Sequence, residues 1–135
     1  MSKRVYEIDG STFDSLEGFY DEIERKLIPG VYWGRNLDAF NDILRGGFGT
    51  PVGGFVLRWV KSARSRHALG YPETIRYVEE KTRRCHPSNV PAVRADLEAA
   101  RRGEGPTLFG ILVDIVRVHC AGGTEQDDEV ELELT

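Results

Sequence analysis

Two aspartates, Asp38 and Asp42, lie four residues apart shortly after the aromatic pair Tyr32-Trp33. Two carboxylates held close together can act as a general acid and a general base, or can form part of an acidic binding surface. Like charges at this spacing destabilise an isolated helix by roughly 0.2–0.5 kcal/mol, and aspartate is a poor helix former. The pair therefore indicates a use beyond the stability of its own helix.

An enzymatic use of the two aspartates finds little support elsewhere in the sequence. Catalytic carboxylates are usually oriented by a third group, and no G-x-S-x-G, P-loop or H-E-x-x-H motif accompanies this pair. A structural use also stays open, in which Asp38 complements the positive end of the helix and Asp42 pairs with Arg45. Aromatic residues beside charges are typical of protein interfaces, so Tyr32 and Trp33 favour a binding surface without a catalytic residue.

Two other groups of residues could supply ligand sites. Cys85-His86 and His119-Cys120 would supply four zinc ligands if they met, but adjacent ligands lack the C-x2-C spacing that lets two side chains converge on one ion. The glycine-rich stretch 46–54 has neither the Lys-Ser/Thr nor the following helix start of a phosphate-binding loop. We therefore expect no metal, no cofactor and no disulfide.

Hydrophobic spacing predicts the element that carries the aspartates. Asn36 is a good N-cap residue, and Leu37, Phe40 and Leu44 form the apolar stripe of a helix that ends at a pair of glycines. Strands are predicted at 5–8 and 55–60. Because helices separate them, the two strands should pair in parallel.

The helix before this segment is predicted over residues 15–27. Asp14 and Glu17 have the spacing of a capping box at its start. Its remaining acidic residues, Asp21, Glu22 and Glu24, are interpreted as a solvated face.

The second half of the chain is predicted to be mainly helical, with helices over 72–84 and 90–102. The apolar stretch 107–119 is long for a strand and places its polar residues on one stripe, which favours a buried helix. Residues 129–134 alternate strictly and predict a third strand. We expect one domain over residues 1–135, with a helical insertion at about 61–106.

Composition and charge fit a small protein that binds a cationic partner. The chain has 135 residues, a net charge of -4 and two cysteines. Residues 58–102 carry 11 basic and 5 acidic side chains, so the remainder is strongly acidic and would speed association with a basic protein. The basic residues lack interleaved aromatic platforms, so we expect a solvated helical face and no direct contact with nucleic acid.

Nothing in the sequence indicates export or membrane insertion. No apolar signal-like region opens the chain, and no apolar run approaches 18 residues. We therefore expect a cytoplasmic protein with reduced cysteines.

The segment around the aspartates resembles a known family. The aromatic-Gly-x-Asn-Leu-Asp-Ala-Leu-x-Asp segment of the barstar family is similar to residues 32–42, and its Val-Leu-x-Trp strand is similar to residues 56–59. The resemblance covers roughly residues 5–60. It implies an α/β fold in which a three-stranded parallel sheet packs with helices, here with the extra helical insertion. It also implies an intracellular inhibitor that plugs the active site of a secreted ribonuclease.

The resemblance also implies roles for individual residues. The aspartate matching Asp42 occupies the phosphate site of the nuclease, the one matching Asp38 contacts nearby basic residues, and the tyrosine matching Tyr32 packs on the catalytic histidine. Gly34 lets the backbone approach. Asn41 replaces the family's helix tryptophan, and Arg35 replaces a residue that is often acidic. The candidate partner-binding residues are Tyr32, Trp33, Gly34, Arg35, Asn36, Asp38, Asn41, Asp42 and Arg45.

Two functions follow from these expectations. The first is inhibition of a basic, extracellular-type ribonuclease, either the organism's own enzyme before export or a delivered toxin against which the chain gives immunity, as in a toxin–antitoxin pair. The alternative keeps the barstar fold as a protein-binding module with a non-nuclease partner and uses the insertion as its binding surface.

Overall fold

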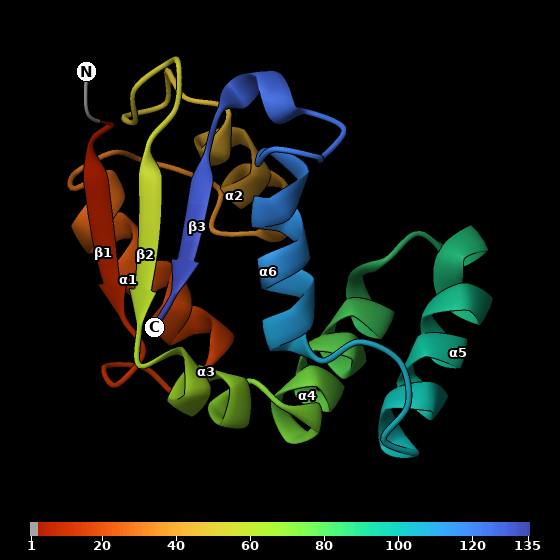
Figure 1. Ribbon diagram of the computed structural model, residues 1–135. Coiled ribbons are helices and arrows are strands. Elements are labelled where there is room, and N and C mark those ends of the chain that lie inside the picture. The colour runs from red at the N-terminus through yellow and green to blue at the C-terminus, as the bar shows by residue number, and fades with distance from the viewer. Residues whose placement is uncertain (1–2) are drawn as a thin grey trace.

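The computed structural model describes residues 3–135, whose three strands form one parallel sheet (Figure 1). The strands are β1 (Val5–Asp9), β2 (Val56–Val60) and β3 (Glu131–Leu134), in the order β1-β2-β3. Tyr6 lies opposite Leu57, and Leu57 lies opposite Leu132. The three-stranded parallel sheet expected from the sequence is confirmed.

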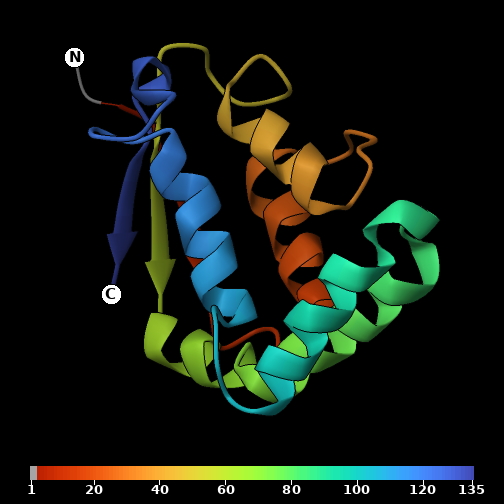
Figure 2. The same cartoon turned by 90° about the vertical axis from the view of Figure 1, so that its right-hand side faces the viewer.

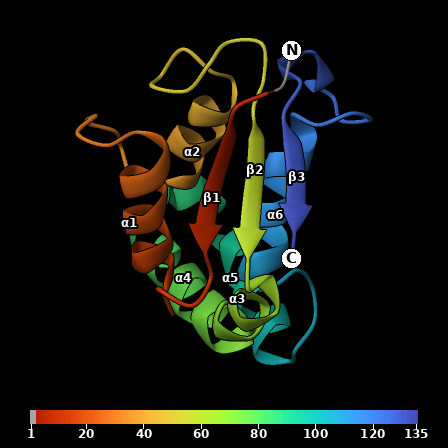
Figure 3. The ribbon, with the colours of Figure 1, turned by 60° about the vertical axis from the view of Figure 1, so that its left-hand side comes forward.

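Three helices cover one face of this sheet: α1 (Leu16–Leu27), α2 (Leu37–Leu44) and α6 (Leu108–Val118) (Figures 1 and 3). Their buried aromatic rings meet those of the sheet. The ring centroid of Phe19 lies 5.2 Å from that of Phe40 and 5.4 Å from that of Trp59, and Trp59 lies 5.1 Å from Phe109. This aromatic cluster fixes α2 against α1 and the sheet, because buried rings are large and pack in few geometries.

The predicted buried helix near the C-terminal end is confirmed as α6. Its first turn is capped by Thr107, whose Oγ1 accepts a hydrogen bond from the backbone N–H of Gly110 at 3.2 Å. Such a cap satisfies one of the unpaired donors at a helix start. The residues of α6 that face the sheet are apolar, which explains why the stretch also resembled a buried strand.

No helix among residues 3–135 covers the other face of the sheet (Figure 3). Glu7, Arg58 and Glu133 occupy one register row across the three strands. The Nε of Arg58 donates to the Oε2 of Glu133 at 2.7 Å. This exposed row of alternating charge accounts for the polar residues that alternate with the buried ones along each strand.

The segment between β2 and α6 is helical and comprises α3 (Ser62–Ala68), α4 (Tyr71–Arg84), the short η1 (Pro87–Asn89) and α5 (Val90–Arg101). The two longer helices form a hairpin that projects beside α1 and α6 (Figure 2). The hairpin has a small apolar cluster of its own, formed by Val78, Val93 and Leu97. A further short helix, η2 (Gln126–Asp128), precedes β3.

Helix α3 was absent from the sequence prediction because its buried face is made of serines. Ser62 and Ser65 are buried, and the Oγ of Ser65 accepts from the indole N–H of Trp59 at 3.0 Å. A seven-residue helix whose core contact is a hydrogen bond has no apolar stripe. Hydrophobic periodicity indicates a helix only where such a stripe is present, so it does not indicate α3.

The start of α1 differs from the sequence prediction. The N-cap is Ser15, whose side chain accepts from the N–H of Gly18 at 3.1 Å, whereas Asp14 pairs with Arg64 at 2.7 Å. The proposed capping box of Asp14 and Glu17 is therefore wrong.

The interpretation of Glu22 as part of a solvated face is also wrong. Its side chain is 1% exposed, and its Oε2 accepts from the backbone N–H of Asp9 at 2.8 Å. Arg25 and Lys26, one turn further along the helix, supply the positive charge that a buried carboxylate requires. Glu22 thus joins α1 to the end of β1.

We expect Glu22→Ala to lower the free energy of unfolding by roughly 1–3 kcal/mol, because the partly buried N–H of Asp9 would lose its acceptor. Urea unfolding of the variant measures this. The matched control is Glu98→Ala, which removes an exposed carboxylate paired with Arg101 and should change stability by less than about 0.5 kcal/mol. Equal midpoints for the two variants would contradict the assigned role of Glu22.

Candidate partner-binding surface

Helix α2 presents the two aspartates and is held by buried residues on its other side. Asn36 caps it, with its Oδ1 accepting from the N–H of Ala39 at 2.7 Å. Phe40, Ile43 and Leu44 are buried, whereas Leu37 is only partly buried against the core. The predicted stripe therefore holds for two of its three members, and Ile43 takes the place of Leu37 as a full core residue.

Both aspartates are exposed on the solvent side of α2. The Oδ1 of Asp42 accepts from Arg45 at 2.9 Å, and Asp38 lies in the first turn, where a negative charge complements the helix dipole. Burial, followed by the charge of Asp38, raises the pKa of Tyr77, which places Asp38 near α4. The structure thus contains the local pairings that helix energetics suggested, and it leaves both carboxylates at the surface.

The adjacent aromatic residues point in opposite directions. The Tyr32 side chain is 93% exposed, whereas Trp33 is 3% exposed and packs at right angles to Tyr20, with 5.4 Å between ring centroids. The indole N–H of Trp33 donates to the Oε1 of Glu24 at 3.1 Å. Trp33 therefore anchors the segment to α1 and holds Tyr32 out in solvent.

Arg35 is a second anchor between this segment and α1. Its Nη2 donates to the Oδ1 of Asp21 at 2.6 Å, and its guanidinium lies 6.0 Å from the ring centre of Tyr20. Burial raises the pKa of the Tyr20 phenol well above its ordinary value, so the ring stays neutral beside the guanidinium. The backbone of Arg35 has a φ of 51°, a strained conformation that these contacts help to maintain.

Gly34 lies where a larger residue would disturb the start of α2. A Cβ atom at this position would be 2.9 Å from the Nδ2 of Asn36, the side chain that caps the helix. A substitution would therefore displace the cap. Gly34 itself is exposed beside Tyr32.

A polar network that the sequence analysis missed holds the other end of α2. The Oδ1 of Asn41 lies 2.6 Å from the Nε2 of His119, and the Nδ1 of His119 lies 2.6 Å from the Oδ2 of Asp128. Arg45 bonds Glu125 at 3.0 Å. These residues are about 80 positions apart in the chain, and no local pattern links them.

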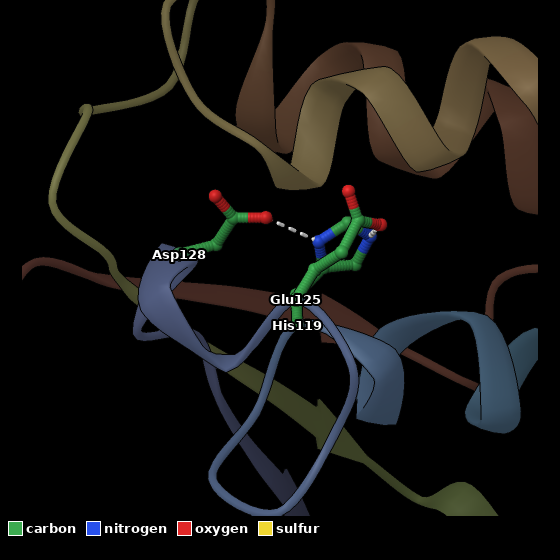
Figure 4. A group of neighbouring side chains, drawn as sticks. All are labelled: His119, Glu125 and Asp128. Atoms are coloured by element: carbon green, nitrogen blue, oxygen red, sulfur yellow. Dashed lines mark hydrogen bonds and ion pairs between the residues drawn. The ribbon is translucent and has the colours of Figure 1, made fainter.

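His119, Glu125 and Asp128 also lie close enough to be tested as a metal site, since one ligand atom from each lies within 4.8 Å of the others. Figure 4 shows that the two carboxylates approach different nitrogens of the ring. Asp128 is at Nδ1, and Glu125 is 3.9 Å from Nε2. One ion bound in the plane of the ring can meet only one of its nitrogens, so the three side chains fit a hydrogen-bond network better than a metal centre.

The two cysteine–histidine pairs considered as zinc ligands lie at the ends of different helices. Cys85-His86 follows α4 and His119-Cys120 follows α6. Both cysteines are free thiols in this structure, and burial raises the pKa of Cys120. The Nδ1 of His86 contacts Ser88 at 2.7 Å. The Nδ1 atom of His86 and both ring nitrogens of His119 are thus engaged with other side chains of the protein.

Comparison with protein families places the segment that forms this surface in a known group. The family described as Barstar (barnase inhibitor) matches residues 3–93, which run from β1 through α4 and into α5. The match covers more than half of the chain. This chain belongs to the barstar family. Its sheet and the helices around it have the architecture that the barstar resemblance implied, and the match extends well beyond residues 5–60.

A curated relative adds a narrower likeness. The protein named "Putative ribonuclease inhibitor YrdF" from Bacillus subtilis (strain 168) is 42% identical over 45 residues. These residues are 33% of this chain and 50% of the relative, so the chain matches half the length of that protein. His119 and Glu125, which contact Asn41 and Arg45, fall outside the range matched to the barstar family.

The helices of the structure give no indication of a membrane span. Among residues 3–135, none combines the length and the apolar character needed to cross a bilayer.

Proposed function

We propose that this protein inhibits a basic ribonuclease by occupying its active site with Tyr32 and the exposed face of α2. Asp42 takes the place of a substrate phosphate among the cationic groups of the enzyme, and Asp38 pairs with basic residues at the rim. Gly34 allows close approach of the backbone. The inhibitor contains no catalytic residue in this proposal, because it acts by blocking access to the site.

The observation that carries the proposal is the position of Tyr32. The Tyr32 side chain is 93% exposed and lies beside two exposed carboxylates. Its apolar ring surface stays in contact with water unless a partner covers it. Trp33 and Arg35 anchor this segment to α1 through hydrogen bonds to Glu24 and Asp21, respectively. Such anchoring lowers the entropy that the segment loses on binding, which favours tight association.

The charge distribution supports the same kind of partner. Outside residues 58–102 the chain carries 7 basic and 17 acidic side chains. A cationic enzyme would be attracted to this acidic part of the chain over a distance set by the salt concentration. We propose that the inhibitor acts in the cytoplasm, on the organism's own secreted ribonuclease before export or on an incoming toxin ribonuclease.

The direct test is an inhibition assay with purified full-length protein. Cleavage of a fluorogenic RNA would be followed with two enzymes, barnase and any ribonuclease encoded next to the gene for this chain. Stoichiometric loss of activity with at least one of them supports the proposal. No inhibition of either enzyme, together with no complex by calorimetry, would favour a non-nuclease partner.

A comparison of the two aromatic residues separates contact from support. Tyr32→Ala should leave the free energy of unfolding nearly unchanged, because the ring is exposed, and should weaken binding by about 2 kcal/mol or more if Tyr32 is a central interface residue. Trp33→Ala should lower stability by roughly 3–5 kcal/mol, because it removes a buried aromatic ring. Urea unfolding and inhibition titrations measure both effects. A Tyr32→Ala protein with unaltered inhibition would contradict the proposed surface.

A further inference from the structure

The His119 imidazole is fully buried between α2 and the segment that connects α6 to β3. One ring nitrogen contacts Asn41 on α2 and the other contacts Asp128 on η2, each at 2.6 Å. The backbone oxygen of His119 also accepts from the N–H of Val130 at 3.1 Å, directly before β3. His119 therefore connects α2, through its side chain and its backbone oxygen together, to the C-terminal part of the sheet.

The contact with His119 adds to the apolar packing that already holds α2. Helix α2 has eight residues, and the loop that follows contains five glycines with positive φ, at positions 46, 47, 49, 53 and 54. Phe40, Ile43 and Leu44 pack in the core and fix α2 against α1 and the sheet. Hydrogen bonds are directional, so the bond at Asn41 restrains rotation of α2 about its own axis.

A second polar contact lies one turn further along α2. Arg45 bonds Glu125 at 3.0 Å and also pairs with Asp42 at 2.9 Å. The charged groups facing the His119 ring are thus Asp128 and Glu125 from the loop, and Arg45 from α2 beside Glu125. The two contacts hold the helix face that carries the proposed binding aspartates.

We propose that His119 is a positioning residue that holds α2 through hydrogen bonds from its two ring nitrogens to Asn41 and Asp128. The amide of Asn41 can donate or accept, so a bond at Nε2 forms with either orientation of that amide. Loss of either bond removes this connection between α2 and the segment before β3, and α2 then becomes more mobile.

Amide hydrogen exchange in the free, full-length protein tests this positioning role. Asn41→Ala and Asp128→Ala should each make the amides of α2 exchange about tenfold faster, the equivalent of one hydrogen bond, while the amides of α1 keep their rates. The double variant should exchange little faster than either single variant, because both changes break the same connection. The matched control is Thr124→Ala, an exposed position on the same loop, which should leave α2 unchanged.

The contrast between helices and a conservative variant separate positioning from a general loss of stability. A general loss of stability would speed exchange in α1 as much as in α2. Asp128→Asn keeps an oxygen that can accept from the ring, so it should restore much of the α2 protection that Asp128→Ala loses. An equal rise in all helices, additive effects of Asn41→Ala and Asp128→Ala, or α2 protection that neither variant lowers would each overturn the proposal.

The consequence for inhibition rests on the proposed function and is measured separately. With barnase as the probe, Asp128→Ala should weaken binding although Asp128 lies on the opposite side of the ring from α2. If barnase is not bound at all, the proposed function fails for that enzyme. The exchange measurements still decide whether His119 positions α2, because they need no partner.

Discussion

Asp42→Ala is expected to weaken binding to the inhibited ribonuclease about a thousandfold or more, a loss of several kcal/mol. The substitution would leave the cationic groups of the enzyme buried without a counter-charge, which costs more than the original pair contributes. This magnitude is the one known for close charge pairs between barnase and barstar, the namesake of the family, and is not a value calculated for this chain.

The same substitution should have little effect on the free protein. Asp42 is exposed, and its contact with Arg45 is a surface pair between residues three apart in one helix. Such pairs contribute about 0.5 kcal/mol or less, and alanine is a better helix former than aspartate. Urea unfolding should therefore give a free energy within about 0.5 kcal/mol of the unaltered protein.

The matched control for Asp42 is Asp96→Ala on α5, another exposed helical aspartate. It should affect neither stability nor inhibition. An Asp42→Ala protein that inhibits at unaltered strength would rule out the proposed mechanism. A loss of binding with Asp96→Ala but not with Asp42→Ala would instead assign the binding surface to the α4–α5 hairpin.

Phe40→Ala is expected to lower the free energy of unfolding by roughly 3–5 kcal/mol. Phe40 is fully buried, and its ring stands at right angles to that of Phe19 with 5.2 Å between the centroids. The substitution removes this contact and leaves a cavity between α2, α1 and the sheet. Urea unfolding monitored by circular dichroism would measure the change, and binding should also weaken because α2 loses its main anchor.

Leu37→Ala is the matched control for Phe40, because Leu37 lies on the same helix but is only partly buried. Its removal exposes less of the core, so the cost should be clearly smaller than that of Phe40→Ala. If the two variants lost equal stability, Leu37 would have to be packed more tightly than the structure shows.

The sequence alone determined the elements whose residues repeat with a regular period. Phe40 and Leu44 on α2, the apolar run of α6 and the alternation over residues 129–134, which contain β3, are local patterns, and each predicts its element without knowledge of the fold. The parallel sheet followed because helices separate consecutive strands. The segment at residues 32–42 also indicated the candidate surface, since its residues are neighbours in the chain.

The tertiary structure alone decided what each polar side chain does. Trp33 and Tyr32 are adjacent in sequence, yet Trp33 is buried and donates its indole N–H to Glu24 on α1, whereas Tyr32 is exposed. Asn41 meets a histidine 78 positions away. Such pairings depend on distances between elements that no periodicity encodes, because a single directional hydrogen bond leaves no repeating pattern in the sequence.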